Sequence, residues 1–303
     1  MEKLQQALEK ARANRAAGLT PQGAPYAMAG VPQGATLQGG GPTQAPPPET
    51  GATPTGWAPS GRGHADSGSW RALAQMHIDP QTIATNRVLV TGGNNGSAHY
   101  DILRTRLREE ARRHSARRIA ILSGAPGAGK STTTANLGLS FGRLPFMRTM
   151  VFDFDLRQPS LHTLLGQSPA SDMGAVISGE TGFAGHMLRH GDNLAFGLNR
   201  GPVANSGALL QSTQLEDFLD AVQDSYAPDL MLFDMPPFLV ADDAHGFLQQ
   251  VDGVVLLVEA EVTSKAQVDL LEQKLSALTR VLGVVLNKCH FPDESDTAAY
   301  GYY

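Results

Sequence analysis

The sequence predicts an α/β fold with a mostly parallel sheet and helices on both faces, preceded by a disordered N-terminal region. Short, continuous apolar runs recur along the chain, and stretches with helical spacing of apolar residues separate them. Strands that are apolar throughout are buried on both faces, which is typical of parallel sheets. A long stretch rich in proline and glycine precedes these runs and has no apolar period. Such a stretch cannot bury enough surface to offset its ordering entropy, so it is predicted to be disordered.

The region before the folded part contains one helix candidate and a linker. In residues 1–17, apolar residues from Leu4 to Ala11 recur at helical spacing among lysines and arginines. An isolated helix this short is marginal, so it is either solvated or a docking segment for a partner or for the membrane surface. Residues 18–85 include the run GGGPTQAPPPETGATPTG and are predicted to be a disordered linker.

Residues 86–290 are predicted to form the folded domain, and residues 291–303 a flexible tail that carries tyrosines. In chain order, strands are expected at 118–123, 149–154, 194–198, 230–234, 251–260 and 281–287, and helices at 130–144, 213–226 and 264–278. In an open parallel sheet of this kind, ligands bind outside the carboxyl ends of the strands.

Composition excludes several classes of protein. The net charge of −5 argues against general nucleic-acid binding. Cys289 is the single cysteine, which leaves neither a disulfide framework nor a thiolate zinc site and is expected to be a plain buried thiol. There is no secretory signal and no apolar run long enough for a direct membrane span. The sequence therefore indicates a cytoplasmic protein.

The segment GAPGAGKS at 124–131 matches the pattern G-x-x-x-x-G-K-[ST] at every fixed position. It follows a predicted strand and opens a predicted helix, which is the context that this phosphate-binding loop requires. Gly127 and Gly129 would let the backbone curl so that its N–H groups form an anion nest. Lys130 would reach the β- and γ-phosphates, and Ser131 would ligate Mg²⁺. The predicted fold is therefore that of a P-loop NTPase.

Acidic residues stand at the ends of two other predicted strands. Asp234 ends the run 230–234, and Asp153 and Asp155 end the run 149–154. Their period-two spacing points Asp153 and Asp155 to the same side if the strand continues. Neighbouring carboxylates repel one another unless a cation lies between or beside them. Together with the phosphate loop, these acids predict a magnesium site.

Several stretches, in order, resemble the bacterial tyrosine kinases of the BY-kinase family, which are P-loop proteins that govern capsule and exopolysaccharide production. The similarity begins near Gly92 and extends to the end of the chain. SGAPGAGKSTTTANLG resembles the Walker A motif of that family, VFDFDLRQPSLH its Walker A′ motif, and LFDMPPFLVADDA its Walker B motif. The last two apolar strands and the tail with its tyrosines complete the series.

The resemblance implies ATP and Mg²⁺ as cofactors and gives roles to individual residues. Lys130 and the loop amides would hold the phosphates, and Ser131, Asp153 and Asp234 would organise Mg²⁺. Asp153 or Asp155 would position or deprotonate the acceptor hydroxyl, which makes Lys130, Asp153 and Asp155 the catalytic set. The nucleotide-binding set implied in this way comprises Gly124, Ala125, Pro126, Gly127, Ala128, Gly129, Lys130, Ser131, Thr132 and, at the adenine, Asn287.

The function that the resemblance implies is that of an ATP-dependent protein-tyrosine autokinase regulating exopolysaccharide or capsule biosynthesis and export. Tyr300, Tyr302 and Tyr303 would accept the γ-phosphoryl group in a neighbouring subunit. The implied partner is a membrane-embedded regulator of polysaccharide chain length, which would recruit the protein to the inner face of the cell membrane. The alternative is a P-loop ATPase or an ATP-binding regulatory scaffold without kinase activity. ATPases of the plasmid-partition type carry an extra lysine where this chain has Ala125.

The resemblance also implies a homo-oligomer. In members of the family, a helix with the pattern Glu-x-x-Arg-x-x-Arg joins the subunits. Here Ala98 and Asp101 stand in place of the Glu and the first Arg, and Arg104 matches. The basic run at 108–118 is interpreted as the solvated end of a helix. Contact with the cytoplasmic segment of a membrane-protein partner is the alternative.

Overall fold

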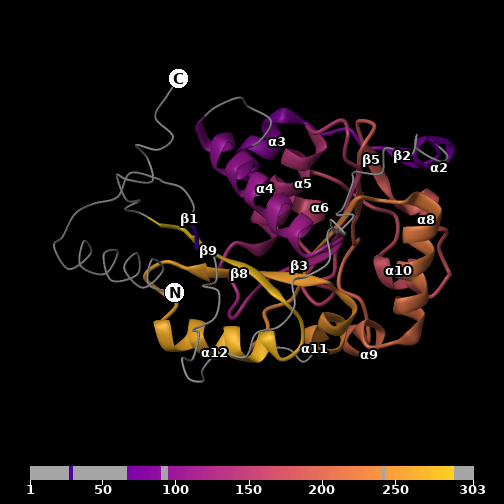
Figure 1. The fold of residues 1–303 in the computed structure, drawn as a ribbon. Helices are drawn as coiled ribbons and strands as arrows, with labels where there is room; N and C mark the ends of the chain where they lie inside the picture. Colours follow the sequence, from indigo (N-terminus) through magenta and orange to yellow (C-terminus); the bar gives the residue numbers. More distant parts are fainter. Residues whose placement is uncertain (1–26, 30–66, 90–94, 241–242, 290–303) are drawn as a thin grey trace, which may run out of the picture.

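The computed structural model describes residues 27–29, 67–89, 95–240 and 243–289. Within these ranges the strands form one sheet with the order β1-β9-β8-β3-β7-β4-β6-β5-β2. Neighbouring strands are parallel from β9 across to β6, whereas β1 and β5 pair antiparallel with β9 and β6. Helices lie on both faces of the sheet (Figure 1). The predicted fold class is confirmed.

The elements follow one another along the chain with a strand-helix alternation. The strands are β1 Ala27–Ala29, β2 Ala74–Gln75, β3 Arg118–Ser123, β4 Thr149–Asp153, β5 Leu188–His190, β6 Leu194–Gly197, β7 Leu230–Asp234, β8 Gly253–Glu259 and β9 Val281–Asn287. The helices are α2 Ser67–Arg71, α3 Pro80–Thr85, α4 Asn95–Arg113, α5 Lys130–Gly142, α6 Leu161–Leu164, α7 Met173–Ile177, α8 Phe183–His186, α9 Ser206–Leu210, α10 Thr213–Tyr226, α11 Asp243–Phe247, the 3-10 helix η1 Leu248–Gln250 and α12 Lys265–Ser276. All the strands and helices predicted within the folded part are present.

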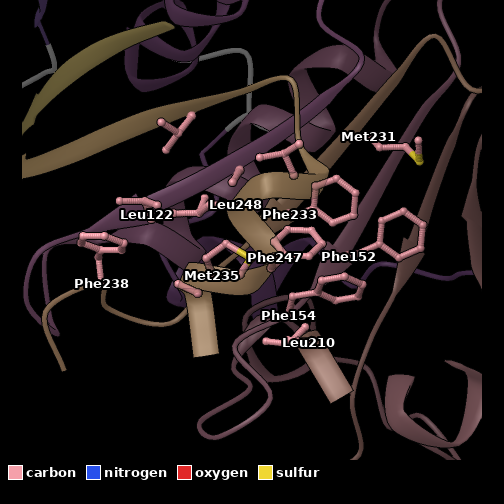
Figure 2. Close-up of a cluster of buried hydrophobic side chains, with 14 of the residues drawn as sticks. Leu122, Phe152, Phe154, Leu210, Met231, Phe233, Met235, Phe238, Phe247 and Leu248 are labelled. Atoms are coloured by element: carbon pink, nitrogen blue, oxygen red, sulfur yellow. The ribbon is translucent and has the colours of Figure 1, made fainter. Parts of the chain in front are cut away.

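The core has two halves, one on each face of the sheet, because successive strand residues point to opposite faces. On one face Phe152 and Phe233 pack with α10, α11 and α12. Figure 2 shows these two rings beside Phe154 and Phe247 in a buried aromatic cluster. On the other face, Val151 and Leu232 pack with α4 and α5. The central strands are buried along almost their whole length, which is why their sequences are continuously apolar.

The folded part begins earlier than the predicted boundary at residue 86. Residues 67–85, predicted to be part of the linker, contain α2, β2 and α3. The large apolar side chains of Trp70, Leu73, Met76 and Ile83 in this segment are buried. Burial of these side chains offsets the entropy cost of ordering the segment. The glycine- and proline-rich composition around it led to the prediction of a disordered linker. The strand β1 also lies within the predicted linker, whereas the predicted helix at 1–17 and the tail at 291–303 lie outside the described residues.

Trp70 anchors this additional segment to the domain. Its indole Nε1–H donates to the backbone oxygen of Tyr226 at 2.7 Å, at the end of α10. The guanidinium carbon of Arg148 lies 5.2 Å from the ring centroid of Trp70, within the range of a cation–π contact. The side chain is 1% exposed. The indole therefore combines a large apolar contact with a satisfied polar group.

We expect Trp70→Ala to lower the free energy of unfolding by about 3 kcal/mol, since removing a buried aromatic side chain leaves a cavity. Urea denaturation followed by far-UV circular dichroism measures this change. Phe146→Ala is the control because Phe146 is 53% exposed, and we expect a loss of about 1 kcal/mol or less. Equal stability of Trp70→Ala and the unmodified chain would contradict the packing of α2 against α10.

Candidate active site

The phosphate loop connects β3 to α5 at the carboxyl edge of the sheet, as the sequence predicted. Gly127 and Gly129 have φ angles of +83° and +93°, which side chains rarely adopt. A Cβ at Gly129 would also lie 2.2 Å from Nδ2 of Asn287, so no side chain fits there. Gly129 is the N-cap of α5, and no side chain caps this helix start. The first amides of α5 are thereby left to bind an anion.

Lys130 is the first residue of α5 and is buried, with 7% of its surface exposed. Burial raises the pKa of the carboxyl groups of Asp155 and Asp234, and the nearby ammonium group of Lys130 opposes this rise at both. Ser131 and Thr132 follow on the first turn and are partly exposed. The helix therefore places one cation and two hydroxyl groups beside the loop amides, as phosphate binding requires.

Asp153 and Asp234 are direct neighbours across two parallel strands. They are aligned in the register of β4 and β7, and both are fully buried. Oδ2 of Asp153 accepts hydrogen bonds from the backbone N–H groups of Ser160 and Leu161, at 3.1 Å each, and so holds the start of α6. Among the described residues, Oδ1 of Asp153 and both carboxylate oxygens of Asp234 make no hydrogen bond of normal distance and angle, although the hydroxyls of Ser131 and Thr134 lie close to Asp234. Three buried acceptors therefore meet at the edge of the sheet.

Burial raises the pKa of both carboxyl groups. The pKa of Asp153 lies well above its usual range, first because of desolvation and then because of the charge of Asp234. Desolvation raises the pKa of Asp234 to about 7, although Lys130 and the hydroxyls of Ser131 and Thr134 lower it. Unpaired buried carboxylates are costly, and a cation between them removes that cost.

Asp155 lies two residues after Asp153 and is 7% exposed. Its Oδ1 accepts the backbone N–H of Gln158 at 3.2 Å. Desolvation raises the pKa of Asp155, and Lys130 lowers it. The structure thus brings Lys130, Asp153, Asp155 and Asp234 to one place, although they come from three separate segments of the chain.

The donor set fits Mg²⁺. This ion prefers oxygen ligands, and it binds through one or two carboxylates together with waters and phosphate oxygens. Asp153 and Asp234 offer three free carboxylate oxygens, and Ser131 offers a hydroxyl beside them. Within the described residues, no group of three or more His, Cys, Asp or Glu side chains is arranged to hold a metal by itself. Ser131, Asp153 and Asp234 are therefore suited to an ion that binds together with a triphosphate, whose oxygens would supply further ligands.

Asn287 ends β9 and is buried against the phosphate loop. Its Nδ2 donates to the carbonyl oxygen of Ala128 at 2.7 Å, and its Oδ1 accepts the backbone N–H of Lys288 at 2.7 Å. The side chain therefore fixes the loop backbone directly before Gly129. The predicted contact between Asn287 and adenine stays a prediction.

Sequence reasoning missed Asn199, which supports the backbone of the acidic loop. Its Nδ2 donates to the carbonyl oxygen of Asp153 at 2.6 Å, and its Oδ1 accepts the N–H of Met173 at 2.8 Å. Asn199 has no exposed surface. The sequence signal that could have identified Asn199 is its position as a polar residue directly after the apolar run 194–198.

Two predicted features lie elsewhere. Tyr300, Tyr302 and Tyr303 are outside the described residues. Asp101 and Arg104 on α4 are paired within the chain: Asp101 binds Arg104 and Arg143 at 3.0 Å each, and it accepts the hydroxyl of Ser140 at 2.6 Å. This cluster joins α4 to α5.

The basic run at 108–118 contains the C-terminal end of α4, as expected for a solvated helix end. Arg113 and Glu110 form an ion pair there, and Arg118 reaches Asp220. No α-helix of the described residues combines the length and apolar character needed to traverse a lipid bilayer.

Comparison with known proteins gives one family match. The family model described as ParA, NUBPL iron-transfer P-loop NTPase, matches residues 114–300. This range includes the phosphate loop and all three acids.

Named relatives agree with the resemblance predicted from the motifs, which is thereby confirmed. The chain is 28% identical over 209 residues to tyrosine-protein kinase YwqD of Bacillus subtilis, covering 68% of this chain and 86% of that one. It is also 28% identical over 176 residues to the succinoglycan biosynthesis transport protein ExoP of Rhizobium meliloti, covering 56% of this chain and 22% of that one. The kinase domain of the Escherichia coli tyrosine kinase ETK shares the fold, with a TM-score of 0.60 at 21% identity, covering 66% and 79% of the two chains.

Proposed function

The chain belongs to the ParA family of P-loop NTPases, and we propose that within this family it is an ATP-dependent protein-tyrosine kinase of exopolysaccharide or capsule biosynthesis. The observation that carries this proposal is the meeting of Lys130, Asp153, Asp155 and Asp234 beside the phosphate loop. Relatives named as tyrosine-protein kinases support the reaction. A single cysteine argues against iron–sulfur chemistry, which uses several thiolates.

Phosphoryl transfer needs alignment and charge neutralisation more than covalent participation by the protein. The loop amides and Lys130 would hold the β- and γ-phosphates, and the adenine would lie toward Asn287. Mg²⁺, when bound, would neutralise phosphate charge, and Ser131, Asp153 and Asp234 would hold it. These residues would keep the γ-phosphorus in line with an incoming hydroxyl group.

The acceptor would be a tyrosine of the tail: Tyr300, Tyr302 or Tyr303. Its phenol oxygen forms a bond to the γ-phosphorus, the bond to the β-phosphate oxygen breaks, and ADP leaves. The phenol proton passes to a carboxylate. Asp155 suits this role better than Asp153, because Asp153 is fully buried and is proposed to hold Mg²⁺, whereas Asp155 keeps 7% of its surface exposed. The raised pKa of Asp155 makes it a stronger base than an exposed carboxylate.

The setting proposed for the reaction is the cytoplasmic face of the membrane. A membrane-embedded regulator of polysaccharide chain length would recruit and activate the protein, and transfer between subunits would require a homo-oligomer. The polysaccharide context is supported by the similarity to the transport protein ExoP.

The test of this function is the position of the label after incubation with Mg²⁺ and γ-labelled ATP. We expect phosphotyrosine at residues 300–303 by mass spectrometry, and the triple variant Tyr300→Phe, Tyr302→Phe, Tyr303→Phe should lose it. Tyr26→Phe, a tyrosine outside the tail, is the matched control and should keep the label. Release of free phosphate without phosphotyrosine would identify an ATPase, and bound but intact ATP would identify a regulatory scaffold.

A further inference from the structure

An ion pair between the half-exposed Arg157 and the buried Asp243 joins two loops beside the proposed active site. The guanidinium of Arg157 donates to both carboxylate oxygens of Asp243, from Nε at 2.7 Å and from a terminal nitrogen at 2.6 Å. Asp243 is 3% exposed at its side chain. Its Oδ2 also accepts the hydroxyl of Ser206 at 2.7 Å. A Cβ at Gly207 would lie 2.8 Å from Oδ1 of Asp243, so α9 approaches the carboxylate too closely for a side chain there.

The two partners come from the loops that follow the two acid-bearing strands. Arg157 lies four residues after the end of β4, two positions beyond Asp155, and Asp243 begins α11 in the segment that follows β7. One helical turn later on α11, Phe247 packs against Phe154 with ring centroids 5.2 Å apart. Figure 2 shows Phe154 and Phe247 in contact in the buried cluster. Asp155 is thus flanked on both sides by residues that contact α11.

We infer that Arg157 and Asp243 form a brace that positions Asp155 for phosphoryl transfer, an inference that rests on the proposed function. Arg157 is a positioning residue in this role, since it acts through Asp155. The brace ties the loop after β4 to the loop after β7 and thereby fixes Asp155 relative to Asp234.

The geometry supports this role over a general contribution to stability. A two-point fork fixes direction as well as distance, which a single lysine contact does not. Two backbone bonds lie on either side of Asp155: the N–H of Phe154 donates to the carbonyl oxygen of Asp234, and the N–H of Val203 donates to that of Leu156, at 2.8 Å each. Neither of them fixes the direction of the loop at Arg157. Without Arg157, the buried charge of Asp243 would face Asp155, which it already repels. Asp155 would then move away from its place near Lys130.

The experiment compares three variants of the full chain: Arg157→Gln, Arg157→Lys and Arg113→Gln. Arg113 is the matched control, because its side chain is 61% exposed, against 56% for Arg157, and also pairs with a carboxylate, that of Glu110 at 2.9 Å. Single-turnover consumption of γ-labelled Mg-ATP is measured, with phosphotyrosine and free phosphate summed. Nucleotide affinity is measured with a fluorescent ATP analogue, and thermal unfolding checks the fold.

We expect Arg157→Gln to slow the single turnover by about tenfold or more, because a small displacement of a positioned group is costly. Its nucleotide affinity should stay within about twofold of the unmodified chain, since the phosphate loop is untouched. Arg157→Lys should have an intermediate rate, and Arg113→Gln the unmodified rate. Two results for Arg157→Gln would overturn the proposal that the brace positions Asp155: a loss of nucleotide affinity alone, or a single-turnover rate equal to that of the unmodified chain.

Other outcomes separate the brace from the proposed function. If Arg157→Gln does not fold, Arg157→Lys decides, and an unmodified rate in that variant overturns the brace. If the unmodified chain releases free phosphate without phosphotyrosine, the kinase proposal fails, yet the ratio of rates still tests the brace. A chain that binds ATP and leaves it intact overturns both.

Discussion

Replacing Lys130 with methionine is expected to lower the rate of phosphoryl transfer by about 10²–10³-fold or more, the cost of removing a preorganised group that stabilises developing charge. Lys130 is buried at the start of α5, and it is the cation that acts on both Asp155 and Asp234. Methionine has similar length and is apolar, so the packing of the side chain stem is retained while the charge is lost. Single-turnover assays with γ-labelled ATP measure the effect.

Nucleotide binding should fall with catalysis in this variant, because Lys130 is proposed to contact the phosphates both before and during transfer. Lys274→Met is the matched control: Lys274 lies in the last turn of α12 and is exposed. We expect it to leave the transfer rate unchanged. Full activity of Lys130→Met would show that the loop does not hold the triphosphate in the way proposed.

The phosphate loop could be predicted from the sequence because the residues that form it are consecutive. The segment 124–131 contains the two glycines with positive φ angles, the start of α5 and Lys130. The strands carrying Asp153 and Asp234 could also be found, since central strands of a parallel sheet are apolar throughout. These predictions used local pattern alone.

The pairing of distant segments could not be predicted from such patterns. That β4 lies beside β7, with Asp153 aligned to Asp234, depends on the strand order of the whole sheet. The same limit applies to Asn199, whose two hydrogen bonds join backbone groups far apart in the sequence. Trp70 was assigned to the linker because its partners, Tyr226 and Arg148, belong to distant parts of the chain.

The unpaired carboxylates at the sheet edge lead to a second large effect, on stability and activity in opposite directions. Asp234→Asn should abolish Mg²⁺-dependent transfer, since it removes one of the two proposed carboxylate ligands. The same change should stabilise the metal-free protein, because Asp234 is fully buried and the cost of desolvating its charge outweighs the nearby charge of Lys130 and the neighbouring hydroxyls. A neutral amide costs less to bury than a charged carboxylate.

The gain should depend on pH in a defined window. The pKa of Asp234 is about 7 in the folded protein, against 3.8 for an unperturbed aspartate. Between these values the folded state binds more protons than the unfolded state, so the free energy of unfolding falls as pH rises through the window. At about 1.4 kcal/mol per pKa unit, the deficit above pH 7 is on the order of 4 kcal/mol. Asparagine does not titrate, so the variant should escape this loss.

Urea denaturation in EDTA at several pH values between 4 and 8 measures the difference. We expect Asp234→Asn and the unmodified chain to have similar stability near pH 4, with the advantage of the variant growing until about pH 7 and then levelling. Asp217→Asn, a change at an exposed aspartate of α10, should shift stability by about 0.5 kcal/mol or less at every pH. A variant that is less stable than the unmodified chain at pH 8 would mean that Asp234 is already paired without a metal ion. The acids would then be a structural network, and their place in phosphoryl transfer would have to be given up.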